Sequence, residues 1–237
     1  MSLYFFDQRL RIKSLVEKSL RSHVNMVNEY TVRTNMSLNL KTKNFSPPLK
    51  SKLYISPAYY FLDELVPGRT LNWKDGNSQK IMMKALINMF VFYREQGLFW
   101  TALDDLDLDL LGLQNWLFEH STPDFRKRHR IDILELKNFK VLTAQIHGDF
   151  SPGNILVTAD QSYIIDWELS ERAPLVNDFY RLYRKSEVFR EKLDHFVEAE
   201  RQSDSTDINR FLPLDSQIQI FEYVRSTGNK IIRLRGQ

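Results

Sequence analysis

The chain has 237 residues, with 33 Lys and Arg against 30 Asp and Glu, a formal net charge of +3, 43% hydrophobic residues and no cysteine. This composition is typical of a folded globular protein and excludes a disordered, collagen-like or disulfide-stapled chain. Without cysteine there is no thiolate nucleophile and no Cys-ligated metal, so any chemistry must use oxygen and nitrogen groups. The small positive charge is far from the basic surface of a nucleic-acid-binding protein, so we expect no nucleic-acid partner.

The first residues of the chain alternate apolar and charged side chains and contain no apolar run of signal length. No later segment approaches the roughly 20 apolar residues of a membrane-spanning helix. We therefore expect a cytoplasmic protein without a transmembrane segment. The basic run RKRHR at residues 126–130 is most simply a solvated loop, and contact with an anionic sugar or a membrane surface is the alternative.

The N-terminal part of the chain predicts strands, a helix and more strands. Short apolar alternations predict a hairpin over residues 3–15, and apolar residues at helical spacing predict a helix over 15–34. Residues 52–62 are rich in β-branched and aromatic side chains, which indicates another strand or pair of strands. The dipeptide Pro67-Gly68 is a turn signal and is the predicted boundary of an N-terminal, sheet-bearing lobe.

Helical patterns dominate after this turn. Residues 75–78 can cap a helix whose apolar residues recur at helical spacing until Gly97. Further helices are predicted over residues 110–120, 178–201 and 215–226, and short strands over residues 141–146, 154–157 and 162–167. The two last strands flank a polar loop.

One segment, residues 145–168, carries a specific pattern of polar residues. Asp149 is followed five positions later by Asn154, and a second carboxylate, Asp166, ends the apolar run 163–165. The spacing is that of the catalytic loop and metal strand of protein kinases. A carboxylate beside an acceptor hydroxyl orients it and takes its proton, which is the catalytic role predicted for Asp149. Amide and carboxylate oxygens suit Mg²⁺, so Asn154 and Asp166 are the predicted metal ligands.

The sequence HGDFSPGN at residues 147–154, followed by IIDWE at residues 164–168, resembles the aminoglycoside phosphotransferase and choline kinase family. Members of this family are relatives of protein kinases and phosphorylate small-molecule hydroxyls. The resemblance implies an α+β, two-lobed protein-kinase-like fold. Its parts would be a shortened N-terminal β lobe at residues 1–66, for nucleotide binding, and a mostly helical catalytic lobe at residues 67–237. It also implies ATP and Mg²⁺ as cofactors.

The resemblance assigns supporting roles to further residues. Asp178 matches an Asp that braces the catalytic loop in the family, so we expect it to be structural. His147 is expected to support the loop through hydrogen bonds and not to act as a base. Glu64, Leu65 and Val66 resemble the family hinge, where backbone groups hydrogen-bond adenine.

A lysine for the nucleotide phosphates is predicted near the N-terminus. Lys13 ends a predicted strand, as does the lysine that contacts the α- and β-phosphates in kinases, and Glu29 in the following helix is its expected ion-pair partner. Lys18 and Glu17 are rivals for these roles, and a solvated surface pair is the alternative. No glycine precedes Gly68, so the N-terminal lobe has no Gly-rich phosphate loop.

The predicted function is ATP- and Mg²⁺-dependent phosphorylation of a small-molecule hydroxyl. A sugar of a bacterial surface glycan is the first acceptor to consider, and aminoglycosides, choline or other amino alcohols are the alternatives. The acidic segment 104–109 would suit a cationic acceptor, so an aminoglycoside stays an alternative. A weakly active or inactive pseudokinase, acting as a binding module, is the rival from another class, because the glycine loop is missing.

Three aspartates at alternate positions resemble the start of a calcium-binding loop. Asp105, Asp107 and Asp109 have the right spacing, but Leu110 and Trp116 occupy the positions where such a loop requires Gly and Glu. We therefore reject calcium binding and expect these acids on a solvent-exposed face.

Overall fold

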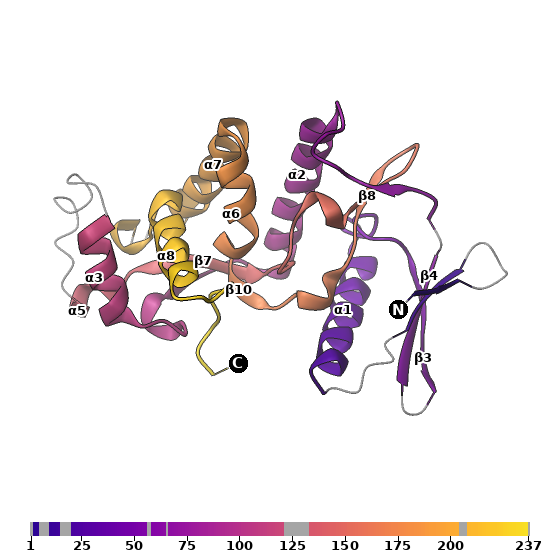
Figure 1. The fold of residues 1–237 in the computed structure, drawn as a ribbon, viewed down its shortest axis with the longest axis horizontal. Helices are drawn as coiled ribbons and strands as arrows, with labels where there is room; N and C mark the ends of the chain where they lie inside the picture. The colour runs from indigo at the N-terminus through magenta and orange to yellow at the C-terminus, as the bar shows by residue number, and fades with distance from the viewer. Residues whose placement is uncertain are drawn as a thin grey trace. The chain divides into compact units, whose positions relative to one another are not determined.

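The structure, a computed structural model, describes residues 2–4, 10–14, 20–55, 58–64, 66–120, 133–203 and 208–236 (Figure 1). Contacts between residues divide the chain into two compact units. The first unit comprises Met1–Glu95 and His147–Glu171, and the second comprises Gln96–Ile146 and Arg172–Gln237. The polypeptide therefore passes between the units three times. The division into lobes after Val66 stays a prediction.

The first unit contains an antiparallel sheet with the strand order β1-β2-β4-β3. Its strands are β1 (Ser2–Tyr4), β2 (Leu10–Ser14), β3 (Leu49–Ile55) and β4 (Ala58–Glu64). The hairpin and the strand pair predicted from the sequence are thus confirmed, although residues 5–9 of the hairpin lie outside the described residues. In this sheet Lys13 of β2 pairs with Phe61 of β4, and Glu64 ends β4 opposite Leu10.

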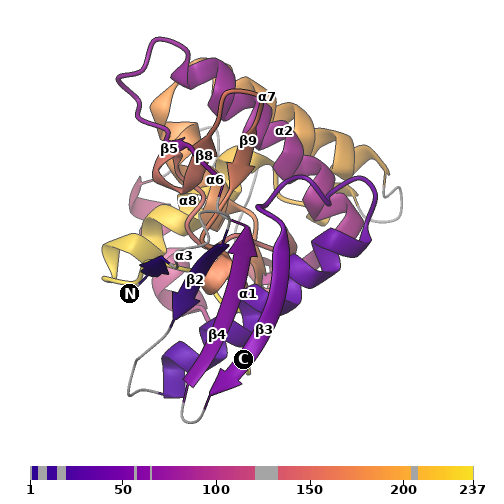
Figure 2. The ribbon, with the colours of Figure 1, turned by 90° about the vertical axis from the view of Figure 1, so that its right-hand side faces the viewer.

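Two long helices belong to this unit. Helix α1 (Leu20–Leu38) packs against β3 and β4, as Figure 2 shows, and buries Val32 and Met36. It extends four residues beyond the predicted end at Thr34, and residues 15–19 lie outside the described residues. Helix α2 (Ser78–Gln96) begins at the predicted cap and ends before Gly97. Gly97 has a φ of +88°, a left-handed conformation in which glycine commonly terminates a helix.

A second sheet of the first unit has the order β5-β8-β9, with β5 (Arg69–Thr70), β8 (Ile155–Val157) and β9 (Ser162–Ile164). The strands flanking a polar loop were predicted from the sequence and are confirmed. Gly68 leads into β5, and a Cβ at Gly68 would lie 2.6 Å from the carbonyl oxygen of Val157. Glycine is required there because the turn passes directly against the backbone of β8.

The second unit is built on a three-stranded antiparallel sheet with the order β10-β7-β6. Its elements are β6 (Phe99–Ala102), η1 (Leu103–Asp105), α3 (Leu110–His120), α5 (Ile133–Leu136), β7 (Lys140–Gln145), β10 (Arg172–Pro174), α6 (Val176–Lys185), α7 (Glu187–Ser203), η4 (Ile208–Arg210) and α8 (Leu214–Ser226). Helices α6, α7 and α8 pack on one another (Figure 1). Helices α3 and α8 have the bounds predicted from the sequence, to within one residue.

The single helix predicted over residues 178–201 is wrong, because the structure has two helices there. The break falls at Ser186, which adopts an extended conformation with φ −161° and ψ 154°. The carbonyl of Ser186 accepts the N–H of Arg190 at 3.1 Å, so Ser186 becomes the N-cap of α7. Phe179 and Leu182 of α6 are buried, as are Phe189 and Leu193 of α7.

Three acids meet where α7 approaches α8. Asp194 is exposed at the surface, but partial desolvation raises its pKa, and the negative charges of Asp215 and Glu198 raise it further. A raised pKa means that the folded state binds this proton more tightly than the unfolded chain does, so ionised Asp194 destabilises the fold at neutral pH. We expect Asp194→Asn to raise Tm at pH 7 by about 1 °C.

This gain should fade as the pH falls through the raised pKa and vanish below the ordinary value of 3.8, where Asp194 is protonated in both states. Differential scanning calorimetry between pH 7 and pH 3.5 measures it. Asp160→Asn, in the exposed turn between β8 and β9, is the matched control and should leave Tm unchanged at pH 7. A gain at position 194 that persists at pH 3.5 would contradict the electrostatic cause.

Among the described residues, no helix combines the length and the apolar character that crossing a lipid bilayer requires. The residues 126–130, which carry the basic run, lie outside the described residues.

Candidate active site

The segment predicted to carry the chemistry lies wholly within the first unit, between the end of β7 and the short helix η3 (Trp167–Leu169). His147 opens it and is fully buried. Its Nε2 lies 2.9 Å from the carbonyl oxygen of Ile165, which can only accept a hydrogen bond. The backbone N–H of Asp149 donates to Nδ1 at 3.3 Å. Nε2 therefore carries the proton and Nδ1 is the acceptor, which fits the supporting role predicted for this histidine.

Gly148 adopts a φ of +88°, and a Cβ at this position would lie 2.3 Å from the carbonyl oxygen of Leu169. Two independent constraints thus require glycine here: the left-handed backbone and the close approach of the chain after η3. The sequence His-Gly-Asp is explained by this contact, because any side chain would push the loop away from Leu169. Gly148 places Asp149 relative to the turn that follows Asp166.

Asn154 ends the short helix η2 (Pro152–Asn154) and holds Asp149. Its Nδ2 donates to the backbone carbonyl of Asp149 at 2.8 Å and to the carboxylate oxygen Oδ2 at 3.2 Å. Because the amide nitrogen serves these two acceptors, the amide oxygen is the atom that can ligate a cation. Asn154 therefore fixes the predicted catalytic carboxylate while keeping an oxygen ligand.

The backbone of Ile165 connects residues 147–154 to the segment that ends at Asp166. Its N–H donates to the carbonyl of Asn154 at 2.9 Å, and its carbonyl accepts from His147. The pairing of β8 with β9 continues this register, with Ile155 opposite Ile164. Asp166 is the next residue in the chain, so these bonds place it beside the segment that contains Asp149 and Asn154.

Asp166 has φ 69° and ψ 58°, and it is the one non-glycine residue with a positive φ among the described residues. This conformation is costly for most L-residues but is tolerated by Asp and Asn, and it clusters at functional sites. It is held in place by Trp167, which is fully buried and donates from Nε1 to the carbonyl of Ile164 at 3.1 Å. The indole packs against Phe92 of α2 and the ring of His147, with centroids 4.8 and 4.6 Å away.

The donor set matches a hard divalent cation. Asn154 offers an amide oxygen and Asp166 a carboxylate, and both are ligand types that Mg²⁺ prefers. No group of three or more His, Asp or Glu side chains in the described part of the chain is arranged to hold a metal by itself. A site with two protein ligands suits Mg²⁺, which retains waters and binds through substrate phosphates.

The residues predicted to bind the nucleotide are spread over the first unit. Lys13 lies on β2 and Glu64 at the end of β4, while Leu65 lies outside the described residues. Val66 is half-buried and is separated from β5 by two residues, so the predicted hinge leads into the sheet that contains β8 and β9. Glu29 of α1 is buried, and its Oε1 accepts from Arg33 at 3.3 Å.

An ion pair between Lys13 and Glu29 stays a prediction, and the rivals Lys18 and Glu17 lie outside the described residues. Asp178 lies in the second unit, in the first turn of α6, and is buried with 1% exposure. Its expected structural role agrees with this burial, while the brace to the catalytic loop stays a prediction.

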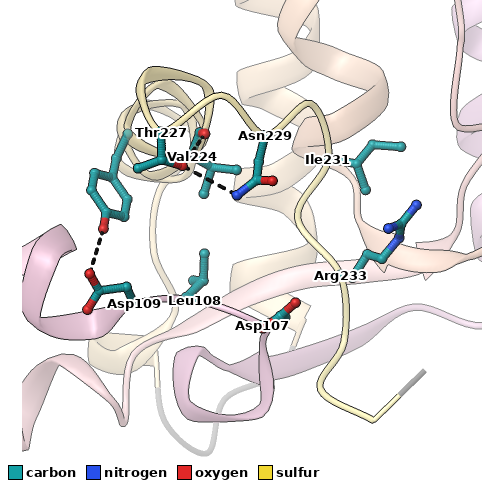
Figure 3. A pocket seen from close by; sticks show the side chains of 9 residues that line it. Asp107, Leu108, Asp109, Val224, Thr227, Asn229, Ile231 and Arg233 are labelled. Atoms are coloured by element: carbon teal, nitrogen blue, oxygen red, sulfur yellow. Dashed lines mark hydrogen bonds between the residues drawn. The ribbon is translucent and has the colours of Figure 1, made fainter.

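The acidic segment belongs to the second unit and lines a pocket of about 300 Å³ (Figure 3). Asp105, Asp107 and Asp109 are exposed there, as expected. Asp109 has a role that the sequence analysis missed: its Oδ1 accepts the N–H of Gly112 at 3.0 Å and caps α3. Its Oδ2 accepts from the hydroxyl of Tyr223 at 3.3 Å, and burial together with this carboxylate raises the pKa of Tyr223. An Asp directly before the helix at Leu110 was the available signal.

The sequence and fold were then compared with those of known proteins. Residues 100–214 match the phosphotransferase enzyme family, and this range includes Asp149, Asn154 and Asp166. The search of curated proteins gave no match. The family resemblance predicted from the motifs at residues 147–154 and 164–168 is confirmed.

Two solved structures with a similar chain trace are described as a choline kinase and a choline/ethanolamine kinase family protein. Choline kinase LicA from Streptococcus pneumoniae is 14% identical, with a TM-score of 0.54, over 96% of this chain and 82% of that protein. A choline/ethanolamine kinase family protein from Mesorhizobium loti is 16% identical, with a TM-score of 0.46, over 79% of this chain and 63% of that protein. The chain thus spans less than two thirds of the latter protein. The α+β, protein-kinase-like fold is confirmed by the first of these structures.

The comparisons thus give a protein-kinase-like fold and a match of residues 100–214, just under half of the chain, to the phosphotransferase enzyme family.

Proposed function

We propose that the protein transfers the γ-phosphoryl group of ATP to the hydroxyl of a small molecule. The observation that carries this proposal is the hydrogen-bonded arrangement in which Asn154 holds Asp149 while Ile165 joins both the loop and the strand to Asp166. Phosphoryl transfer depends on positioning and on neutralising charge, and this arrangement supports a role for Asp149 as the base and for Asn154 and Asp166 as oxygen ligands.

Each residue has a defined part in the proposed reaction. Asp149 orients the acceptor hydroxyl and accepts its proton, and Asn154 keeps the carboxylate of Asp149 in place. Asn154 and Asp166 would hold Mg²⁺, which when bound neutralises charge on the phosphates. Lys13 is the proposed contact of the α- and β-phosphates, paired with Glu29, and backbone groups at residues 64–66 are the proposed adenine contacts.

A sugar hydroxyl is the first acceptor that we propose, because the His-Gly-Asp and Ile-Asp-Trp-Glu motifs resemble most those of kinases for surface-glycan sugars. An amino alcohol or aminoglycoside is the second. Two observations favour it: the fold agrees with that of a choline kinase, and Asp107 and Asp109 line a pocket in the second unit. A panel of sugars, amino alcohols and aminoglycosides, each followed by ADP release and by mass analysis of the product, decides among these classes.

Binding of nucleotide and metal is tested separately from transfer. We expect ATP with Mg²⁺ to raise Tm, and at a ligand concentration 100 times Kd the gain is about 2.7 kcal/mol, or roughly 5–10 °C. Asp166→Ala should abolish the part of this shift that depends on Mg²⁺, because it removes a charged ligand. Thermal-shift titrations with ATP, Mg²⁺ and both together measure the effect.

Asp160→Ala is the matched control, because it removes an exposed carboxylate from the turn of the same hairpin. It should keep the shift of the wild type. Absence of any shift in the wild type at millimolar ATP would favour a pseudokinase or binding module over the proposed enzyme.

A further inference from the structure

A buried arginine on α1 contacts two groups at once. Arg33 lies one helical turn after Glu29, and the two side chains are 4% and 2% exposed. Nη1 of Arg33 donates to Oε1 of Glu29 at 3.3 Å, and Nη2 donates to the backbone carbonyl of Pro47 at 2.8 Å. A planar guanidinium can serve two acceptors in different directions, whereas a single ammonium group cannot do so with the same geometry. Arg33 thus ties the helix to the segment before β3.

The segment that Arg33 holds is also bonded to the metal strand. Phe45, two residues before Pro47, accepts the N–H of Ile164 at 2.6 Å through its carbonyl. Ile164 is buried and ends β9, two positions before Asp166. Successive N–H groups of this strand point to opposite sides, Ile164 to Phe45 and Ile165 to Asn154. The strand is therefore held on both edges just before Asp166.

These contacts form one continuous path through the first unit. It runs from Glu29 through Arg33 and residues 45–47 to Ile164, and α1 also packs directly against the η3 turn that follows Asp166. Its two ends are the helix that carries the proposed partner of Lys13 and the strand that ends two residues before a proposed metal ligand, Asp166.

We propose that Arg33 is a positioning residue for phosphoryl transfer. By holding the carbonyl of Pro47 it fixes residues 45–47 against β9 and so sets the position of Asp166. Its part in transfer rests on the proposed function, whereas the coupling of Arg33 to β9 does not and is measured independently of activity.

The simpler role for Arg33 is to neutralise Glu29 inside the protein, and a buried ion pair can have that role alone. The two roles differ in what Arg33→Lys would change. Lysine retains the charge beside Glu29 but not the second donor to Pro47. A purely structural role would change Tm without a specific effect on β9 or on the dependence of the rate on Mg²⁺.

The first experiment is hydrogen–deuterium exchange of the full chain, followed by mass spectrometry. We expect Arg33→Lys to speed exchange in the peptide that contains Ile164 about tenfold, as expected for the loss of one charge-assisted hydrogen bond, while peptides of α2 keep their rate. Lys41→Met is the matched control. It removes a cation from the same connection between α1 and β3. The Nζ of Lys41 pairs with Oε1 of Glu95 at 2.5 Å, and this ion pair involves neither Phe45 nor Pro47.

The second experiment is the rate of ADP formation as a function of Mg²⁺ concentration, with the best acceptor of the panel. Arg33→Lys should raise the half-saturating Mg²⁺ concentration about tenfold and leave kcat at saturating Mg²⁺ within about twofold of the wild type. Lys41→Met should change neither value. This separation of metal affinity from kcat would not follow from a general loss of stability.

Exchange that rises equally in β9 and α2, or that stays unchanged at Ile164, would overturn the proposal. If Arg33→Lys does not fold, the double variant Glu29→Gln with Arg33→Met removes both charges and should show the same selective exchange. A wild-type protein that transfers no phosphate would refute the proposed function. Selective exchange at Ile164 would then still support the coupling, and uniform exchange would still reject it.

Discussion

Asp149→Asn is expected to lower kcat for phosphoryl transfer by about 10²–10⁴-fold, because the amide cannot accept the proton of the acceptor hydroxyl. The substitution preserves the shape of the side chain. It also preserves the backbone carbonyl of Asp149, to which Asn154 donates at 2.8 Å. We therefore expect Tm and the thermal shift with ATP and Mg²⁺ to stay close to those of the wild type. Steady-state kinetics with the best acceptor, at saturating ATP, measures the loss.

Asp160→Asn is the control for this substitution, since Asp160 is exposed in the turn between β8 and β9. It should leave kcat unchanged. If Asp149→Asn kept phosphoryl transfer within tenfold of the wild type, the carboxylate would not be the base and the assignment of the site would be wrong. A loss of both activity and nucleotide binding would instead place Asp149 in the nucleotide site.

Gly148→Ala should impair both stability and activity. The Cβ would add the strain of a side chain at φ +88° and would meet the backbone carbonyl of Leu169 at 2.3 Å, where no flexible side chain can yield. We expect a loss of about 2–4 kcal/mol in the free energy of unfolding, or roughly 5–12 °C in Tm. Displacement of Asp149 should lower kcat by about 10²-fold.

Two glycine controls separate the causes. Gly228 has the same φ of +88° but open space around its Cα, so Gly228→Ala adds only the backbone strain, about 1 kcal/mol, and leaves kcat unchanged. Gly76 has neither a positive φ nor a close neighbour, so Gly76→Ala should be tolerated. A drop in Tm at position 148 no larger than at position 228, with kcat retained, would show that the contact with Leu169 can relax. Thermal denaturation and kinetics of the three variants decide this.

Local patterns predicted the elements whose ends have their own chemical signals. Helix α2 lies between a capping segment at residues 75–78 and Gly97, and both signals act within one turn of the helix. The helices α6 and α7 lacked such a signal. Leu182 and Phe189 are seven residues apart, which continues the helical period across Ser186, so the apolar pattern is the same for one helix or two. The Oγ of Ser186 makes no hydrogen bond, so the break has no side-chain cap that a sequence pattern would reveal.

The sequence predicts the polar residues of the candidate site because the chemistry of phosphoryl transfer fixes their type and their spacing along the chain. The contacts that hold these residues could not be predicted, because they join residues that are distant in sequence. The need for glycine at position 148 depends on where Leu169 returns after η3, and the role of Arg33 depends on the path of residues 45–47. The left-handed backbone of Asp166, directly before the buried Trp167 and its bond to Ile164, is likewise not revealed by the motif alone.

The pairing of β8 with β9 limits how the length of this segment can change by insertion or deletion. Residues 158–161 form an exposed turn, and residues added there would lengthen a loop without altering the match of Ile155 to Ile164. One residue gained or lost within either strand would shift the register. Because alternate residues of a strand face opposite sides, Asp166 would then turn away from Asn154. We therefore expect insertions and deletions to be tolerated in the turn of this hairpin but not within β8 or β9.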